Sequence, residues 1–205
     1  MKQNTLIKRR LLQIGFVSFI VFSTLLTFNR QALAYVLFPW KWSGTTVNYD
    51  PHTMGSGWIQ IASDGRQQWN NVSPSPFTML RNDGSANDVT LQSIDGDGGT
   101  LGRTYLYCGA NLCSAAGQTV TRAIIQFDTV GIWHLDSSCM VPSNAFDARG
   151  VSAHEFGHFA TISHTQSSNC SGTNPATMCG GIPRGSCAYR SLNSDDQAGL
   201  NAQYP

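Results

Sequence analysis

Apolar residues recur along the chain with the periods of both helices and strands. Between residues 57 and 70 the apolar positions, among them Trp58, Ile61 and Trp69, leave the polar positions mostly on the opposite face, which predicts an amphipathic helix. Short runs bounded by Gly, Pro, Asn, Ser or Asp, several of them rich in β-branched and aromatic residues, are typical of strands. They span residues 43–49, 77–81, 89–94, 100–107 and 120–127.

The C-terminal half of the chain contributes two further predicted helices, at residues 146–160 and 194–203. Ser194 is the predicted N-cap of the last helix, and acidic residues follow it in the first turn, where the helix dipole favours anions. The order of strand, helix, several strands and then helix is that of an α+β fold.

The first 34 residues have the pattern of a leader. Basic residues at positions 2 and 8–10 precede an apolar run over 11–28, and Ala32-Leu33-Ala34 follows. This order predicts a secretory signal peptide, residues 1–34, cleaved after Ala34. We therefore expect residues 35–205 to form one extracellular domain without stable membrane association. An uncleaved membrane anchor is the alternative, because the apolar run is close to the shortest length that spans a bilayer.

Charge and cysteine content narrow the partners and the compartment. The formal net charge is +1 and no cluster of Lys or Arg follows the leader, so nucleic acid and anionic membranes are poor candidate partners. All 6 cysteines follow the leader, and an even number in an oxidising compartment predicts disulfides. Short loops favour two pairs and leave a third: Cys108 with Cys113, Cys179 with Cys187, and Cys139 with Cys170.

One segment carries the chemistry: His154, Glu155, His158 and His164 lie at offsets 0, 1, 4 and 10. Residues four apart share a helix face, so His154 and His158 can bind one metal while Glu155 lies close enough to act on a metal-bound water. A catalytic zinc site usually has three protein ligands and one open position. His164 can be the third ligand if the chain turns back after His158, and residues 161–163 permit a turn because they are weak helix formers or favour turns.

The spacing therefore predicts a catalytic zinc site. The cysteine spacings match no zinc-finger pattern, so thiolate ligands are not expected.

Several weaker motifs accompany the zinc segment. They are Lys41-Trp42, Gln68-Trp69-Asn70-Asn71-Val72-Ser73-Pro74, Asp95-Gly96-Asp97-Gly98-Gly99-Thr100-Leu101, Gln126-Phe127-Asp128, Ala176-Thr177-Met178 and Leu192-Asn193-Ser194-Asp195-Asp196-Gln197-Ala198-Gly199. In their types and order the chain resembles the metzincin metallopeptidases, and among them the matrixin (matrix metalloproteinase) catalytic domain. The resemblance covers nearly all of residues 35–205.

The resemblance implies a zincin-like α+β fold: a twisted, mostly parallel five-stranded sheet with an antiparallel edge strand, three helices, and a zinc cleft between two subdomains. It implies that Met178 forms the Met-turn beneath the zinc. A substrate is expected to add itself to the edge strand at Leu101 and Gly102, with a side-chain pocket whose wall includes Pro183.

Two departures from the family pattern matter. Thr161 stands at the turn between the second and third histidines, where the family has glycine, and a threonine at positive φ is strained. The family's second, structural zinc uses histidines at positions where this chain has Gly102-Arg103-Thr104 and Gln126. We therefore expect one zinc ion, the catalytic one.

The loop at residues 95–99 is rich in Asp and Gly. Carboxylate and carbonyl oxygens are the ligands that calcium prefers, so Asp95 and Asp97, with Asp128 as a further ligand, form a candidate calcium site. A polar connection between strands, without calcium, is the alternative.

These features predict a secreted, monomeric, zinc-dependent endopeptidase that acts on proteins or peptides, with Glu155 as the general base. The alternative is a secreted zinc-binding or adhesion protein that has the same fold without catalysis, and the carboxylate of Glu155 argues against it. A serine hydrolase is not expected, because the sequence contains no G-x-S-x-G motif.

Overall fold

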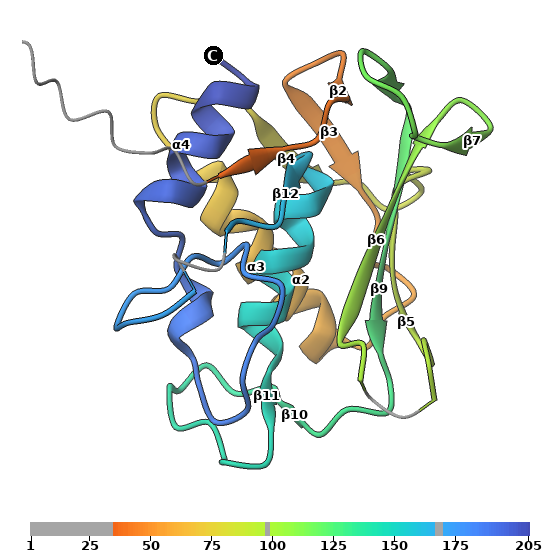
Figure 1. Cartoon of the computed structure of the whole chain (residues 1–205). Helices are drawn as coiled ribbons and strands as arrows, with labels where there is room; N and C mark the ends of the chain where they lie inside the picture. The colour runs from red at the N-terminus through yellow and green to blue at the C-terminus, as the bar shows by residue number, and fades with distance from the viewer. Residues whose placement is uncertain (1–34, 97–98, 167–169) are drawn as a thin grey trace, which may run out of the picture. The chain divides into compact units, whose positions relative to one another are not determined.

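The computed structural model describes residues 35–205, apart from 97–98 and 167–169 (Figure 1). The predicted signal peptide lies outside the described residues and stays a prediction. Among the residues that are described, no helix is long and apolar enough to cross a membrane.

The largest sheet has four strands in the order β5-β9-β6-β7 (Figure 1). β5 (Asp88–Gln92) is parallel to β9 (Arg122–Asp128), whereas β6 (Gly102–Cys108) is antiparallel to β9. β7 (Asn111–Leu112) pairs only with the end of β6, at Tyr107 and Cys108. Within the described part of the chain, the beginning of β6 is therefore an edge with free backbone groups.

A second pair of parallel strands, β3 (Thr46–Tyr49) and β4 (Thr78–Arg81), meets the larger sheet only at an isolated bridge between Asp50 and Asp88. The expected five-stranded sheet is therefore not confirmed, although parallel pairing and one antiparallel strand are present. Asn87 occupies the junction, and its side chain bonds to backbone groups on both sides. A side chain thus satisfies polar groups that a continuous ladder would otherwise pair.

Three α-helices lie in the described residues: α2 (Ser56–Asn70), α3 (Ala148–Phe159) and α4 (Ser194–Gln203), with one 3₁₀ turn, η2 (Ala188–Arg190). The close packing of α2 against α3 depends on Gly65, because a Cβ there would lie 2.6 Å from the backbone of Ser152. The core of large buried side chains lies between these helices and the strands: Tyr49, Trp69, Phe77, Phe127, Phe156 and Phe159.

Helix α4 spans the predicted residues, but its N-cap lies one residue before the predicted one. The N-cap is Asn193 and not Ser194: the Asn193 side chain accepts hydrogen bonds from the backbone of Asp195 and Asp196. The Asp196 carboxylate in turn accepts from the Asn193 backbone, which completes a capping box. Asparagine and serine are both good N-caps, so residue type alone did not distinguish between them.

Two short strand pairs attach the N-terminal segment of the domain. β1 (Val36–Leu37) is antiparallel to β12 (Ile162–Ser163), and β2 (Lys41–Trp42) is parallel to β8 (Thr119–Val120). The predicted strand at 120–127 is thus divided between β8 and β9, which pair with different partners. The pairing of β1 with β12 holds the segment that follows α3.

The disulfides pair differently from the expectation. Cys108–Cys113 is confirmed, but the other two predicted pairs are wrong: the structure has Cys139–Cys187 and Cys170–Cys179. The Cys139–Cys187 disulfide closes a long loop. Arg190 donates hydrogen bonds to the carbonyls of residues 136–138, and these bonds bring the segment of Cys139 beside Cys187. All 6 cysteines are in disulfides, so none is a thiolate ligand.

Candidate metal centre

Helix α3 carries the first two histidines and is buried along most of its length. It begins at Ala148 because the preceding residues form β11 (Phe146–Asp147), which pairs in parallel with β10 (Trp133–His134). The Asp147 side chain caps the helix by accepting from the Gly150 backbone at 3.0 Å. The cap fixes where the helix begins, and the i, i+4 spacing then fixes the relative direction of the two imidazoles.

Gly157 allows Met178 to approach the buried side of α3. A Cβ at Gly157 would lie 2.5 Å from the Trp69 ring and closer still to the Met178 sulfur. Met178 is 1% exposed and lies in the turn whose Thr177 carbonyl contacts the first histidine. The Met-turn implied by the resemblance is therefore in contact with the histidine helix.

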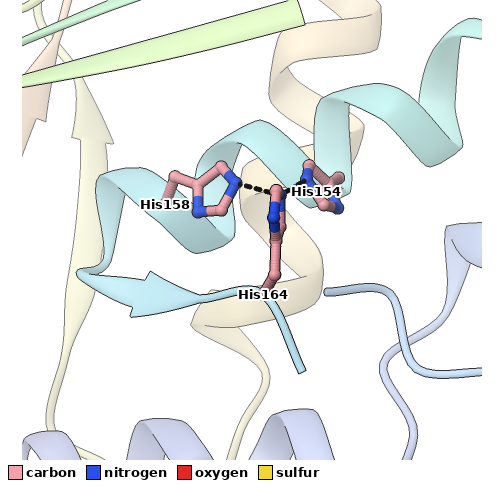
Figure 2. Close-up of side chains that lie close together, drawn as sticks. All are labelled: His154, His158 and His164. Carbon is pink, nitrogen blue, oxygen red and sulfur yellow. Dashed lines mark hydrogen bonds between the residues drawn. The ribbon is translucent and has the colours of Figure 1, made fainter. Parts of the chain in front are cut away.

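The three histidines converge. The Nε2 atom of His164 lies 3.1 Å from that of His154 and 3.0 Å from that of His158. Figure 2 shows His154 and His158 projecting from α3, with His164 reaching them from the segment after β12. A zinc ion at 2.0–2.1 Å from each nitrogen in tetrahedral geometry requires nitrogens about 3.3 Å apart. The two separations to His164 thus agree with zinc geometry to within a few tenths of an ångström, and all three ligand nitrogens lie within 4.8 Å of one another.

Two backbone carbonyls fix which ring nitrogen faces the centre. His154 Nδ1 lies 2.7 Å from the Thr177 carbonyl, and His158 Nδ1 lies 2.8 Å from the Ile162 carbonyl. Because a carbonyl only accepts, each Nδ1 carries the proton and each Nε2 presents its lone pair.

Burial also keeps the imidazoles neutral, which is the form that binds metal. Burial lowers the pKa of His154 to about 4. Burial, together with the charge on His154, lowers the pKa of His158 well below its ordinary value, and burial lowers that of the half-buried His164. All three rings are therefore free of the extra proton at neutral pH.

The turn predicted between the second and third histidines is present. Thr161 has a φ of 63°, in the left-handed region where the family has glycine. Its backbone N–H donates to the His158 carbonyl, and its own carbonyl accepts from the Phe38 backbone. The chain then enters β12 and reaches His164.

Glu155 is the one glutamate in the sequence and is 4% exposed. Its carboxylate accepts a hydrogen bond from the Thr104 hydroxyl at 2.7 Å. Gly102 leaves room for it, since a Cβ there would lie 2.6 Å from Glu155 Oε1. Burial raises the pKa of Glu155 to about 7, which makes the carboxyl able to exchange a proton near neutral pH.

Comparison with protein families matches residues 42–205 to the matrixin peptidase family. The chain belongs to the matrixin family. Matrixins are metallopeptidases, and membership implies zinc at the histidine cluster and protein or peptide substrates. No curated protein sequence matches the chain.

The matrixin site opens into a cleft of about 590 Å³. Leu101 and Gly102 of the predicted substrate strand line it, as do His154, Glu155, His158 and His164. Pro183 is exposed and is not among the lining residues; its buried neighbour Ile182 lines the cleft together with Gly180 and Gly181. The cleft is thus lined by the neighbour of the predicted residue, and its role in substrate binding stays a prediction.

The candidate calcium ligands are partly accounted for by other contacts. The buried Asp128 carboxylate accepts hydrogen bonds from the backbone of Ile94, Val130 and Gly131. Asp95 accepts from the Thr100 backbone at 2.6 Å, and Asp97 lies outside the described residues. Calcium binding stays a prediction.

Sequence reasoning missed the role of Asp196. Its carboxylate accepts from the backbone N–H of Thr177 at 2.8 Å and of Met178 at 3.1 Å, so it holds the Met-turn as well as capping α4. Burial raises its pKa to about 6. The cap position was visible in the sequence, but the contact with the Met-turn depends on tertiary packing.

Proposed function

We propose that this matrixin is a secreted zinc endopeptidase in which His154, His158 and His164 hold the metal and Glu155 is the general base. One observation carries the proposal: the three Nε2 atoms converge in a cleft that the only glutamate of the chain also lines. A non-catalytic zinc-binding protein has no need of a buried carboxyl at this place, with a pKa raised by burial to about 7.

Zinc bound at the cluster supplies Lewis-acid chemistry, which acidifies a water and polarises the scissile carbonyl. The Glu155 carboxylate accepts the proton of the attacking water and delivers it to the leaving amine. The Thr104 hydroxyl and the small volume of Gly102 keep that carboxylate in one orientation.

Strand β6 is the proposed site of substrate binding. Its beginning, Gly102 and the following residues, lies at the sheet edge beside Glu155, and its backbone groups can pair with an extended peptide. Gly180, Gly181 and Ile182 form the facing wall. A peptide between the two would be held mainly by its backbone, with one side chain selected by the cavity.

Glu155→Gln tests this proposal because it removes the base and preserves the shape. We expect one zinc ion per chain to remain bound and cleavage of an unstructured protein to fall by roughly 10²- to 10⁴-fold. Asp83→Asn is the matched control, since it makes the same change at an exposed carboxylate far along the chain from the histidines. Wild-type activity in the zinc-loaded Glu155→Gln variant contradicts the mechanism. A zinc-loaded wild-type chain without peptidase activity supports the binding-protein alternative.

A further inference from the structure

Thr161 makes contacts that a glycine could not make. Its side chain is fully buried, and its Oγ1 accepts a hydrogen bond from Gln203 Nε2 at 2.8 Å. The same oxygen lies 2.9 Å from the hydroxyl of Tyr204 and shares a hydrogen bond with it. Gln203 is the last residue of α4 and Tyr204 follows it. The C-terminal end of α4 therefore contacts the turn that connects the second histidine to the third.

Both partners of Thr161 are fixed by further contacts. The Gln203 amide also donates to the Trp40 carbonyl at 3.1 Å. The ring of Tyr204 stacks on Phe77 with centroids 4.2 Å apart, and its hydroxyl accepts from the Trp42 backbone. The two side chains are therefore anchored before they meet Thr161, and they can hold its position.

The turn controls two of the histidines. The Ile162 carbonyl, next to Thr161, accepts the proton of His158 Nδ1, and so sets the direction of that ring. Two residues further along the chain, His164 supplies the nitrogen that both other histidines face. A displacement of Thr161 would therefore move one ring directly and rotate another.

The backbone strain of a threonine at position 161 is accompanied by hydrogen bonds that only its side chain can form. A glycine would adopt a φ of 63° without strain, whereas threonine is strained there. In return, the hydroxyl satisfies two side chains that are buried with it.

We propose that Gln203 and Tyr204 are positioning residues of the metal centre, which act through Thr161 on the orientation of His158 and His164. The inference deepens the proposed function and rests on it for the identity of the metal. It assigns a role in zinc binding to residues that do not line the cleft.

The test compares Tyr204→Phe and Thr161→Val with the wild-type mature chain. Each variant removes one hydroxyl from the shared hydrogen bond and keeps most of the shape. Ser75→Ala is the matched control, because Ser75 Oγ donates to the backbone carbonyl of Tyr204 and does not reach Thr161. Zinc affinity is measured by competition with a chelator. Hydrogen exchange of residues 160–164 is measured on the metal-free proteins.

Both variants are expected to exchange faster at residues 160–164 and to bind zinc about tenfold more weakly, as is usual for residues that orient metal ligands. The double variant is expected to lose less than the sum of the two single variants, because both changes remove the shared hydrogen bond between Thr161 and Tyr204. Ser75→Ala is expected to behave as the wild type in both measurements.

Unchanged exchange in the two variants overturns the inference, and so does faster exchange with unchanged zinc affinity. A wild-type chain that binds no zinc overturns the proposed function and the assigned role in zinc binding together. In that case, the exchange of the metal-free proteins still decides whether the two side chains hold the turn. If a variant fails to fold, Gln203→Leu replaces it, since this change removes the amide contact to Thr161 and leaves both hydroxyls.

Discussion

The metal centre is made of two regions that obtain their geometry in different ways. His154 and His158 come from α3, where helix periodicity alone places them on one face. His164 comes from a turn at Thr161 with a φ of 63°, held by β1, by Gln203 and by Tyr204. The backbone hydrogen bonds of a regular helix are enough to place its ligands on one face, whereas the backbone of an irregular turn needs partners from elsewhere in the fold to hold its position.

The difference has a consequence for tolerance to mutation. On α3, the size of the side chain at position 157 is restricted, because Met178 and Trp69 pack directly on the backbone at Gly157. At the turn, a hydrogen-bonding group is required at position 161, because the buried side chains of Gln203 and Tyr204 form hydrogen bonds with Thr161 Oγ1. Added volume should damage the first region most, and lost hydrogen bonds should damage the second.

Gly157→Ala is expected to have the largest effect on stability, about 3 kcal/mol, because the new methyl group overlaps tightly packed neighbours. Chemical denaturation of the variant measures the loss. Gly57→Ala is the matched control, since no atom lies within 4 Å of a Cβ there. In α2 the control should stabilise the chain by about 0.5 kcal/mol through helix propensity. Equal effects of the two substitutions would contradict the packing at Met178.

In the metal-free chain, His154 is expected to make a destabilising contribution that grows as the pH falls from 6.5 to 4, while the raised pKa values of Glu155 and Asp196 act in the opposite direction. Burial holds the folded-state pKa of His154 at about 4, below its ordinary value of 6.5. The unfolded chain therefore binds the proton more tightly, so His154 has no effect above pH 6.5 and destabilises the fold progressively below it, by roughly 3 kcal/mol in total. Unfolding by denaturant across this range, for the wild type and for His154→Gln, measures the part of the slope that His154 contributes.

Two variants separate the regions in the same pH experiment. His154→Gln should shift the slope toward greater stability at low pH by more than His164→Gln does, because His154 is buried whereas His164 is only half-buried. The same slope in both variants would mean that burial does not distinguish the helix histidine from the turn histidine.

The smallest expected effect is at Thr161. Thr161→Val should cost about 2 kcal/mol, because Gln203 and Tyr204 lose a buried partner while the backbone strain remains. Thr161→Gly loses the same bonds but relieves about 1 kcal/mol of strain, so its net cost should be about 1 kcal/mol. Denaturation of both variants gives the difference, and a glycine variant less stable than the valine variant would show that strain at this turn is negligible.

Much of the fold could be predicted because its signals are local. The three helices and the main strands lie within a few residues of their predicted positions, since each has its own periodicity and turn residues. The disulfides Cys139–Cys187 and Cys170–Cys179 were not predictable from loop length, because Arg190 and the packing of distant loops decide which sulfurs meet. The interruption of the sheet beside Asn87 depends in the same way on contacts between distant segments.

The sequence by itself determined the chemistry of the site: three imidazoles and a carboxylate at offsets that a helix and a turn can bring to one metal. Tertiary structure decided how the site is held. Asp196 beneath the Met-turn, Ile182 in the cleft wall, and Gln203 and Tyr204 at Thr161 all act across large separations in the chain. No periodicity records such contacts, because buried polar groups take whichever partner the packed chain brings within hydrogen-bonding distance.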